Sequence, residues 1–230
     1  MTDTTDNTDN TDSTGIADEF DPRPVTQRIP RFDGLRWAVR TDHVELSSGE
    51  VVVRDYIVHP GAVGILALDD DDRVLFIRQY RHPVGFQLWE PPAGLMDMVG
   101  ESALRTAQRE LVEEAGLLAD EWHVLADWFN SPGGTSEAFR CFLARGLHEV
   151  PGGRPPGSGE EADLPTAWVP LSDAVDLVLA GALANPTSAT GVLAAAAAQA
   201  RGWQGLRPAD TPWPTRDQLI SQDRVWLPSD

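Results

Sequence analysis

The N-terminal third of the chain is dominated by segments in which hydrophobic and polar residues alternate. Residues 35–47 and 51–58 follow this pattern on either side of a short turn at Gly49, and alternation with a period of two predicts strands. The apolar run over residues 62–68 and the segment 74–80 follow them along the chain. We therefore predict two consecutive β-hairpins.

Four consecutive aspartates, residues 69–72, connect the two segments of the second predicted hairpin. A cluster of acids can suggest a calcium loop, but these residues lack the spaced ligands and the glycine of an EF-hand. We interpret them as a solvated turn.

The remaining two thirds of the chain mix short apolar segments with helical periodicity. Strands are predicted over residues 86–89, 122–129, 138–144 and 166–169, and helices over residues 102–115, 171–183 and 187–201. Strands that come before, between and after a few helices favour a mixed sheet with helices packed on it. The expected fold class is therefore α/β with a mixed (α+β) sheet, and not a doubly wound parallel sheet.

Composition divides the chain into four parts. Residues 1–20 are an acidic, low-complexity tail that cannot bury enough apolar surface to fold, so we expect disorder there. Residues 21–60 hold the first predicted strands, and residues 61–205 form the central domain. Residues 206–230 are an extension with several prolines and two tryptophans, which we expect to wrap the surface of the domain.

The charge balance narrows the choice of partners. The 230 residues include 18 basic residues, all of them arginine, and 36 acidic ones, which gives a formal net charge of −18. Such acidity argues against nucleic acid and anionic membranes as partners, because both are also negatively charged. No apolar stretch reaches the ~18 residues of a membrane-spanning helix, so we expect a cytoplasmic protein. Cys141 is the only cysteine and is interpreted as a packing residue.

The helix predicted over residues 102–115 carries most of the candidate chemistry. At 100° per residue its apolar positions form one stripe, and Glu110, Glu113 and Glu114 share the neighbouring face. Arg109 lies four residues before Glu113, where the two side chains can pair. One interpretation is an ordinary solvated helix surface. The other is a metal site, because close carboxylates repel one another unless a cation lies between them, and their oxygens suit a hard ion such as Mg²⁺.

The spacing around this helix resembles the box motif of the Nudix hydrolases, G-x5-E-x7-R-E-U-x-E-E-x-G-U, in which U is aliphatic. One residue more than the motif specifies separates its first glycine from its first glutamate, and this extra residue leaves the helix spacing intact. The nine matching positions are Gly94, Glu101, Arg109, Glu110, Leu111, Glu113, Glu114, Gly116 and Leu117.

This resemblance implies a hydrolase of nucleoside diphosphates linked to another group, built as an α/β/α sandwich around a mixed sheet and preceded here by the N-terminal β-hairpin. It implies Mg²⁺ or Mn²⁺ as the cofactor. Glu113 is a secondary ligand candidate, and Arg109 is expected to orient the glutamates. We expect Glu114 to be exposed, so that its replacement by glutamine makes no cavity. The implied metal ligands are the carboxylates of Glu110, Glu114 and Glu101 and the carbonyl oxygen of Ala93.

Segments outside the box resemble the ADP-ribose pyrophosphatase branch of this family. The branch implies ADP-ribose as the substrate, AMP and ribose 5-phosphate as the products, and a homodimer that exchanges its N-terminal strands, here residues 35–58. The segments that carry the resemblance are Pro132, which lies sixteen residues beyond Gly116, the loop 131–137, the segments 54–63 and 78–84, and the acidic stretch 160–163.

A diphosphate substrate needs local positive charge in so acidic a chain, and guanidinium groups match phosphate oxygens. Arg54 and Arg81 are the candidates, with surface ion pairing as the alternative. Glu90 is a candidate for contact with the ligand or with metal-bound water, although a carboxylate at a strand end explains it equally well. Glu137 is expected to reach the terminal ribose of the substrate.

The catalytic base is expected in the late acidic loop, where this branch usually places it. Glu160 is the first choice and Glu161 the second. Such a base removes a proton from the water that attacks phosphorus, and the glycine-rich run before it would let the loop close over the substrate. The alternative is a loop that is merely acidic.

Two rival functions are compatible with parts of this pattern. A Nudix hydrolase of another substrate, such as NADH or a nucleotide sugar of the GDP-mannose type, would use the same helix. A catalytically silent Nudix ligand sensor is disfavoured, because all the box carboxylates are present and the sequence contains no basic helix-turn-helix candidate.

Overall fold

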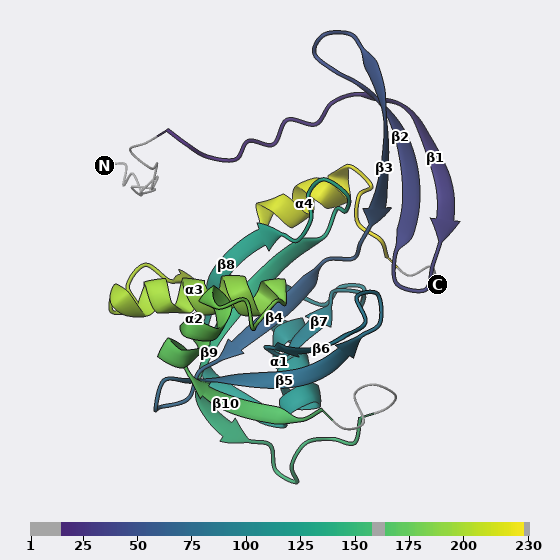
Figure 1. Ribbon diagram of the computed structural model, residues 1–230. Coiled ribbons are helices and arrows are strands. Elements are labelled where there is room, and N and C mark those ends of the chain that lie inside the picture. Colours follow the sequence, from purple (N-terminus) through teal and green to yellow (C-terminus); the bar gives the residue numbers. More distant parts are fainter. Residues whose placement is uncertain (1–14, 158–163, 228–230) are drawn as a thin grey trace, which may run out of the picture.

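The computed structural model describes residues 15–157 and 164–227. Its central sheet has the strand order β11-β8-β9-β4-β7 (Figure 1). β4 and β9 are parallel and the other neighbours are antiparallel, so the predicted mixed sheet is confirmed. The strands are β4 (Ala62–Ala67), β7 (Ala93–Leu95), β8 (Leu117–Phe129), β9 (Ala138–Glu149) and β11 (Arg207–Pro208).

Two further sheets have three strands each. The sheet of order β1-β2-β3 stands at one end of the molecule, apart from the central sheet (Figure 1). The other has the order β10-β5-β6 and packs beside the central sheet. Their strands are β1 (Val25–Asp33), β2 (Ala38–Glu45), β3 (Val51–Val58), β5 (Arg73–Arg81), β6 (Phe86–Glu90) and β10 (Thr166–Pro170).

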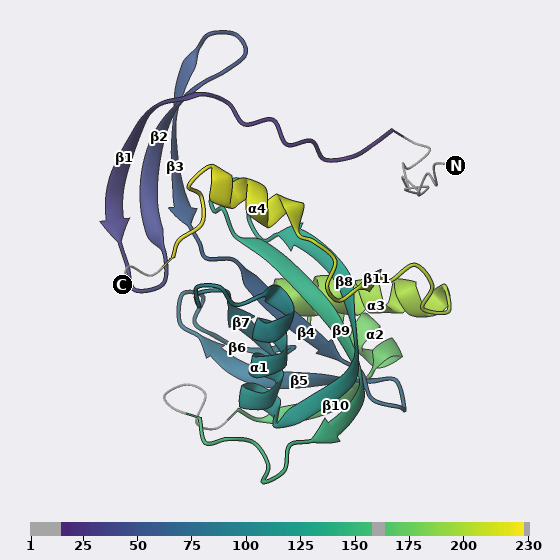
Figure 2. The same ribbon diagram turned by 180° about the vertical axis from the view of Figure 1, so that it is seen from behind.

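Helices cover both faces of the central sheet. α1 (Ala103–Ala115) lies on one face, and α2 (Leu171–Leu179) and α3 (Pro186–Ala200) lie on the other, as the two opposite views show (Figures 1 and 2). This confirms the predicted layering of helix, sheet and helix. α4 (Pro214–Ser221) lies near the N-terminal sheet (Figure 1). Across residues 15–157 and 164–227, none of the helices has the length and apolar character needed to cross a bilayer.

The apolar runs of the buried strands explain this layering. Along β4, Val63 and Ile65 belong to the core cluster that contains Leu111 of α1, whereas Leu66 belongs to the cluster that contains Val192 of α3. Successive side chains of a strand point to opposite faces, so a strand that is covered on both faces is apolar throughout. β4 is accordingly buried along its whole length.

The second predicted hairpin is wrong. β4 and β5 belong to different sheets, and an isolated bridge pairs Leu68, which follows β4, with Val74 of β5. The reason is that both edges of each strand are already paired, since β4 lies between β9 and β7 and β5 lies between β10 and β6. The aspartates between them do form a turn, in which Asp69 Oδ1 accepts a hydrogen bond from the N–H of Arg73 at 2.8 Å.

The predicted N-terminal hairpin is part of a larger sheet. β2 and β3 pair in antiparallel fashion as expected, but β1 adds a third strand that the sequence pattern did not indicate. β1 contains Pro30, which a sheet tolerates at an edge or a bulge because proline has no N–H to donate. The pairing of β1 with β2 shifts register between Pro30 and Phe32, and most of the strand is exposed, so its alternation is weak.

Other differences concern the ends of elements. β8 and β9 are longer than predicted, because they pair with each other from Leu117 opposite Glu149 to Phe129 opposite Ala138. α2 ends earlier than predicted, and β7, β11 and α4 were not predicted. Most of the tail for which we expect disorder lies outside the described residues, and residues 15–24 contain neither helix nor strand.

The C-terminal extension connects the central domain to the N-terminal sheet. Arg140 of β9 donates hydrogen bonds to two carbonyl groups of the extension, and its guanidinium carbon lies 4.7 Å from the ring centroid of the buried Trp213. Beyond α4, the carboxylate of Asp223 pairs with Arg28 and Arg40 of the N-terminal sheet at 3.2 and 2.7 Å. The extension therefore covers part of the domain surface and holds the sheet against it.

Candidate active site

The helix α1 begins and ends at residues that its sequence marks. Ser102 caps the N-terminus, and its hydroxyl oxygen accepts a hydrogen bond from the N–H of Arg105 at 3.3 Å. Gly116 ends the helix in the left-handed conformation, with φ of 66°. A side chain would be strained at this φ, and a Cβ there would also press on the backbone of Arg154. The last glycine of the box is therefore the signal that stops the helix.

Arg109 gathers three of the box carboxylates. Its guanidinium nitrogens lie 3.1 Å from Glu101, 2.7 Å from Glu110 and 3.0 Å from Glu113. The hydrogen bond from Arg109 is the main reason that the pKa of Glu101 lies below its ordinary value. Burial opposes the charge of Arg109, but the bond to Glu101 and the charge of Glu110 outweigh burial and raise the pKa of the guanidinium. Contact with several carboxylates at once is what an arginine needs if it is to orient them.

Glu114 connects the same helix to the central sheet. Its Oε2 accepts a hydrogen bond from the N–H of Ala93, at the start of β7, at 2.8 Å. Glu114 is only 4% exposed. The expectation that Glu114 is exposed is therefore wrong, because this residue lies on the side of the helix that packs on the sheet.

Gly94, the first glycine of the box, has a packing role. A Cβ built on Gly94 would collide with the carboxylate of Glu110. Because glycine has no side chain, α1 can approach β7 closely enough for Glu110 to lie against the strand. Gly94 and Glu110 thus lie against each other, although sixteen positions separate them in the chain.

The donor atoms of this region suit a hard divalent cation. Glu101, Glu110 and Glu114 offer carboxylate oxygens and Ala93 offers a carbonyl oxygen, and Mg²⁺ and Mn²⁺ prefer oxygen ligands. In the part of the chain that the structure describes, no three His, Cys, Asp or Glu side chains are arranged to hold an ion together. Glu101 and Glu110 are instead hydrogen-bonded to Arg109. The oxygen atoms of these four residues are of the kind that binds such a cation, and two of the residues, Glu101 and Glu110, also accept hydrogen bonds from Arg109.

A cavity of about 410 Å³ opens beside β7. Four predicted site residues come together in its wall: Arg81, Glu90, Ala93 and Glu137. They come from β5, β6, β7 and the connection between β8 and β9. Ala93 lines the cavity and also bonds to Glu114, so the cavity adjoins the acidic helix.

Arg81 and Glu90 form an ion pair in this wall. Nε and Nη2 of Arg81 donate to the two carboxylate oxygens of Glu90. The side chain of Arg81 is 40% exposed, whereas that of Glu90 is 2% exposed. Burial raises the pKa of Glu90, and the hydrogen bond from Arg81 opposes this shift. The buried carboxylate thus holds the guanidinium at the cavity, and the ion pair of Arg81 is with a buried acid and not with a surface one.

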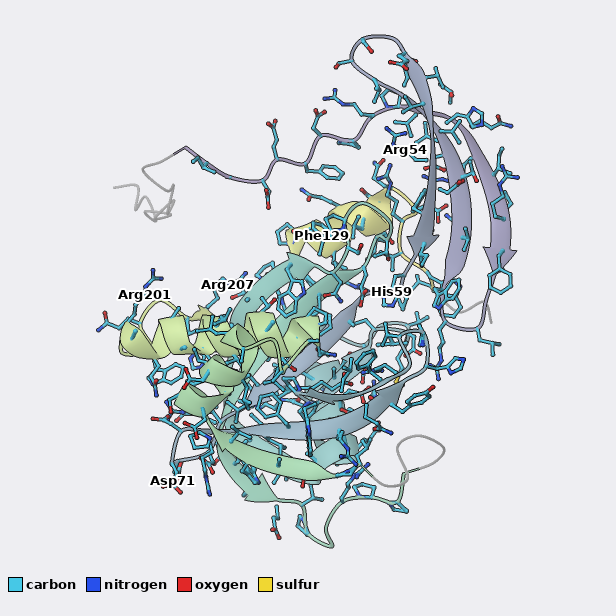
Figure 3. All side chains as sticks on the ribbon, viewed as in Figure 1. Arg54, His59, Asp71, Phe129, Arg201 and Arg207 are labelled. Carbon is cyan, nitrogen blue, oxygen red and sulfur yellow. The ribbon has the colours of Figure 1, made fainter. Side chains whose placement is uncertain are left out.

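Glu137 lies opposite a histidine at the same cavity. Oε1 of Glu137 is 4.0 Å from Nε2 of His59. Nδ1 of His59 accepts a hydrogen bond from the N–H of Gly61 at 3.1 Å, so Nε2 carries the proton of the neutral ring. Burial lowers the pKa of His59, although the charge of Glu137 opposes this. His59 lies where the N-terminal sheet joins the central domain (Figure 3).

Arg54 does not line this cavity. Arg54 lies on the N-terminal sheet (Figure 3), donates to the carbonyl of Val53 at 2.9 Å, and lines a separate cavity near Pro132. Glu160 and Glu161 lie outside the described residues.

Asn185 and His59 line the cavity but were not predicted as site residues. Asn185 stands before Pro186, and asparagine followed by proline is a signal for a helix start. That signal locates the N-terminus of α3 in the sequence. It contains no information about the cavity, because the cavity forms only when α3 packs beside β6.

The chain is similar in sequence to a family model and to proteins of known name. A family model described as NUDIX domain matches residues 58–188. An ADP-ribose pyrophosphatase of Mycobacterium tuberculosis is 44% identical over 192 residues, which cover 84% of this chain and 91% of the relative. An ADP-ribose pyrophosphatase of Bacillus subtilis is 33% identical over 147 residues, which cover 64% of this chain and 78% of the relative.

Comparison with solved structures agrees at the level of the fold. A crystal structure of a protein described as an ADP compounds hydrolase superposes with a TM-score of 0.63 and 22% sequence identity. The match covers 91% of this chain and the whole of the other. At this identity the likeness supports the fold alone.

Proposed function

Because this chain belongs to the Nudix family, we propose that it hydrolyses the pyrophosphate bond of ADP-ribose, giving AMP and ribose 5-phosphate. The supporting observation is the cavity next to Ala93, which is lined by both Arg81 and Glu137. A guanidinium suits a diphosphate, and a carboxylate accepts hydrogen bonds from ribose hydroxyls. The name of the 44% identical relative from Mycobacterium tuberculosis supports the same substrate.

The acidic helix supplies the cation site in this proposal. Glu110, Glu114 and Glu101, with the carbonyl of Ala93, hold a divalent cation, Mg²⁺ or Mn²⁺. When bound, such an ion neutralises charge on phosphate oxygens and lowers the pKa of water. Arg109 orients Glu110 and Glu101 through its hydrogen bonds.

The remaining residues bind substrate and move a proton. Arg81 binds the diphosphate and Glu137 contacts the terminal ribose. Glu160 removes the proton from the attacking water, with Glu161 as the second candidate. A well-placed general base contributes roughly 10²- to 10⁴-fold to a rate.

We also propose that the protein is a homodimer in which the N-terminal sheet serves the partner subunit. Two observations support this. The sheet projects from one end of the molecule (Figure 1), and Arg54, a candidate for phosphate contact, lines no part of the cavity that contains Arg81 in the same chain. A symmetric dimer with exchanged elements needs only an identical partner and a hinge.

A substrate screen tests the proposed reaction. ADP-ribose, NADH, diadenosine polyphosphates and GDP-mannose would be incubated with Mg²⁺ or Mn²⁺, a phosphatase would reveal new terminal phosphates, and the products would be identified. We expect ADP-ribose to be preferred and to give AMP. Preference for NADH or GDP-mannose would overturn the substrate but not the family. No turnover of any substrate with either metal would favour a silent ligand sensor.

A further inference from the structure

We propose that Asn185 is a positioning residue for substrate binding, which acts by holding Glu90 so that Glu90 holds Arg81 at the cavity. This inference rests on the proposed function, because it assumes that Arg81 binds the phosphates of the substrate. It adds a residue from a helix that contains no part of the box.

The carboxylate of Glu90 accepts hydrogen bonds from two different parts of the chain. Arg81 donates to both of its oxygens from β5. Nδ2 of Asn185 donates to Oε2 from the other side, at 2.5 Å. A carboxylate that is 2% exposed depends on such bonds, because each lone pair left without a partner in a buried site is costly.

Asn185 is itself fixed by the start of α3. Its Oδ1 accepts hydrogen bonds from the N–H groups of Thr187 and Ser188 at 2.8 and 3.3 Å. These bonds orient the side-chain amide so that its nitrogen faces Glu90. Ser188 adds a second tie between α3 and β6, since its hydroxyl donates to the carbonyl of Trp89 at 2.8 Å. One side chain thus caps a helix and orients a carboxylate.

The consequence concerns the guanidinium of Arg81. Glu90 engages Nε and Nη2, while Nη1 is not bonded to it, and the side chain remains 40% exposed at the cavity. Without the amide of Asn185, Glu90 has one fixed donor fewer and can turn, and the guanidinium turns with it. Loss of orientation at Arg81 weakens binding of a diphosphate more than it slows the chemical step, so KM is the quantity that changes.

The first test separates the two bonds that Asn185 makes. Asn185→Ser keeps a cap oxygen and removes the amide donor, whereas Asn185→Asp keeps the cap and sets a carboxylate against Glu90. We expect KM for ADP-ribose to rise about tenfold in Asn185→Ser, and further in Asn185→Asp, with kcat changed less than about twofold. An unchanged KM in both variants would overturn the proposal. Thermal unfolding checks that the cap is retained.

A double-mutant cycle tests whether the effect passes through Arg81. In an Arg81→Ala background, Asn185→Ser should raise KM by less than about twofold, because residues that act as a unit are not additive. A full tenfold effect without Arg81 would show that Asn185 acts by another route and would overturn the inference.

A spectroscopic measurement makes the test independent of the reaction. The side-chain Nε–H signal of Arg81 can be identified in an NMR spectrum of the full protein by its loss in Arg81→Ala. We expect this signal to shift and its exchange with water to accelerate in Asn185→Ser. If wild-type protein does not hydrolyse ADP-ribose but the signal responds, the proposed substrate fails and the coupling stands. If turnover is normal and the signal is unchanged, the coupling fails alone.

Discussion

The backbone N–H of Ala93 donates a hydrogen bond to Oε2 of Glu114 at 2.8 Å, across 21 positions of the chain. This bond joins the strand that lines the cavity to the helix that carries the carboxylates. It also brings residue Ala93 close to Glu114. The proposed cation site needs this proximity, because it takes one ligand from the carbonyl of Ala93 and the others from the glutamates of the helix.

Glu114→Gln should abolish turnover and leave the fold intact. Glutamine has nearly the same volume, so no cavity is created, and its side-chain oxygen can still accept from Ala93, so that N–H keeps its partner. Loss of a charged cation ligand should lower kcat by at least about 100-fold, since a bound ion contributes several kcal/mol to phosphoryl chemistry. Steady-state kinetics checks the loss of turnover, and thermal unfolding checks that the fold is intact. Normal activity in this variant would remove the argument for the metal site.

Gly94→Ala should disturb Glu110. The added methyl group would collide with the Glu110 carboxylate, and overpacking of this kind costs about 1–3 kcal/mol of folding free energy. We expect lower stability in urea and weaker Mg²⁺ binding by calorimetry. Gly133→Ala is the matched control, because a Cβ at Gly133 meets open space. Equal cation affinity in both variants would contradict the packing role of Gly94.

The two acids of the late loop can be distinguished by replacing them one at a time. Glu160→Gln should lower kcat by about 10²- to 10⁴-fold, as expected for a general base, with a much smaller change in KM. Glu161→Gln should have the weaker effect. If the order of the two effects is reversed, Glu161 is the base.

His59 should make stability depend on pH. Its pKa is lowered in the folded protein from the ordinary value of 6.5, so the unfolded chain binds the proton more readily. The corresponding stability is complete above pH 6.5 and is lost as the pH falls through the folded pKa. His59→Asn keeps an acceptor for Gly61 but does not titrate. Urea unfolding between pH 8 and pH 5 should therefore show that the free energy of unfolding falls less steeply with falling pH in the variant than in the wild type. An identical dependence on pH in the two proteins would refute the assignment.

Subunit mixing tests the exchanged dimer. If Arg54 serves the partner's cavity, Arg54→Ala and Glu114→Gln chains should each be impaired alone. When the two variants are mixed in equal amounts and reach equilibrium, about half of the dimers are hybrids, and each hybrid has one intact site of its two. About a quarter of wild-type activity should therefore return. No recovery, with hybrids shown to form by mass spectrometry, would place Arg54 outside the partner's site.

The local features of this protein were predictable from the sequence. The helix over residues 102–115 and the face shared by its glutamates follow from periodicity, which acts over a few residues. The segments 62–68 and 138–144 were predicted as strands, and the structure shows that β4, which forms from the first, is buried along its whole length.

Only the tertiary structure decided which of these pieces meet. Pairing by proximity predicted a hairpin of β4 and β5, but each strand has two edges and distant strands occupy them. Glu114 is buried because α1 packs on β7, and Asn185 reaches Glu90 because α3 begins beside β6. Periodicity describes one element at a time, whereas these contacts depend on how elements far apart in the chain pack together.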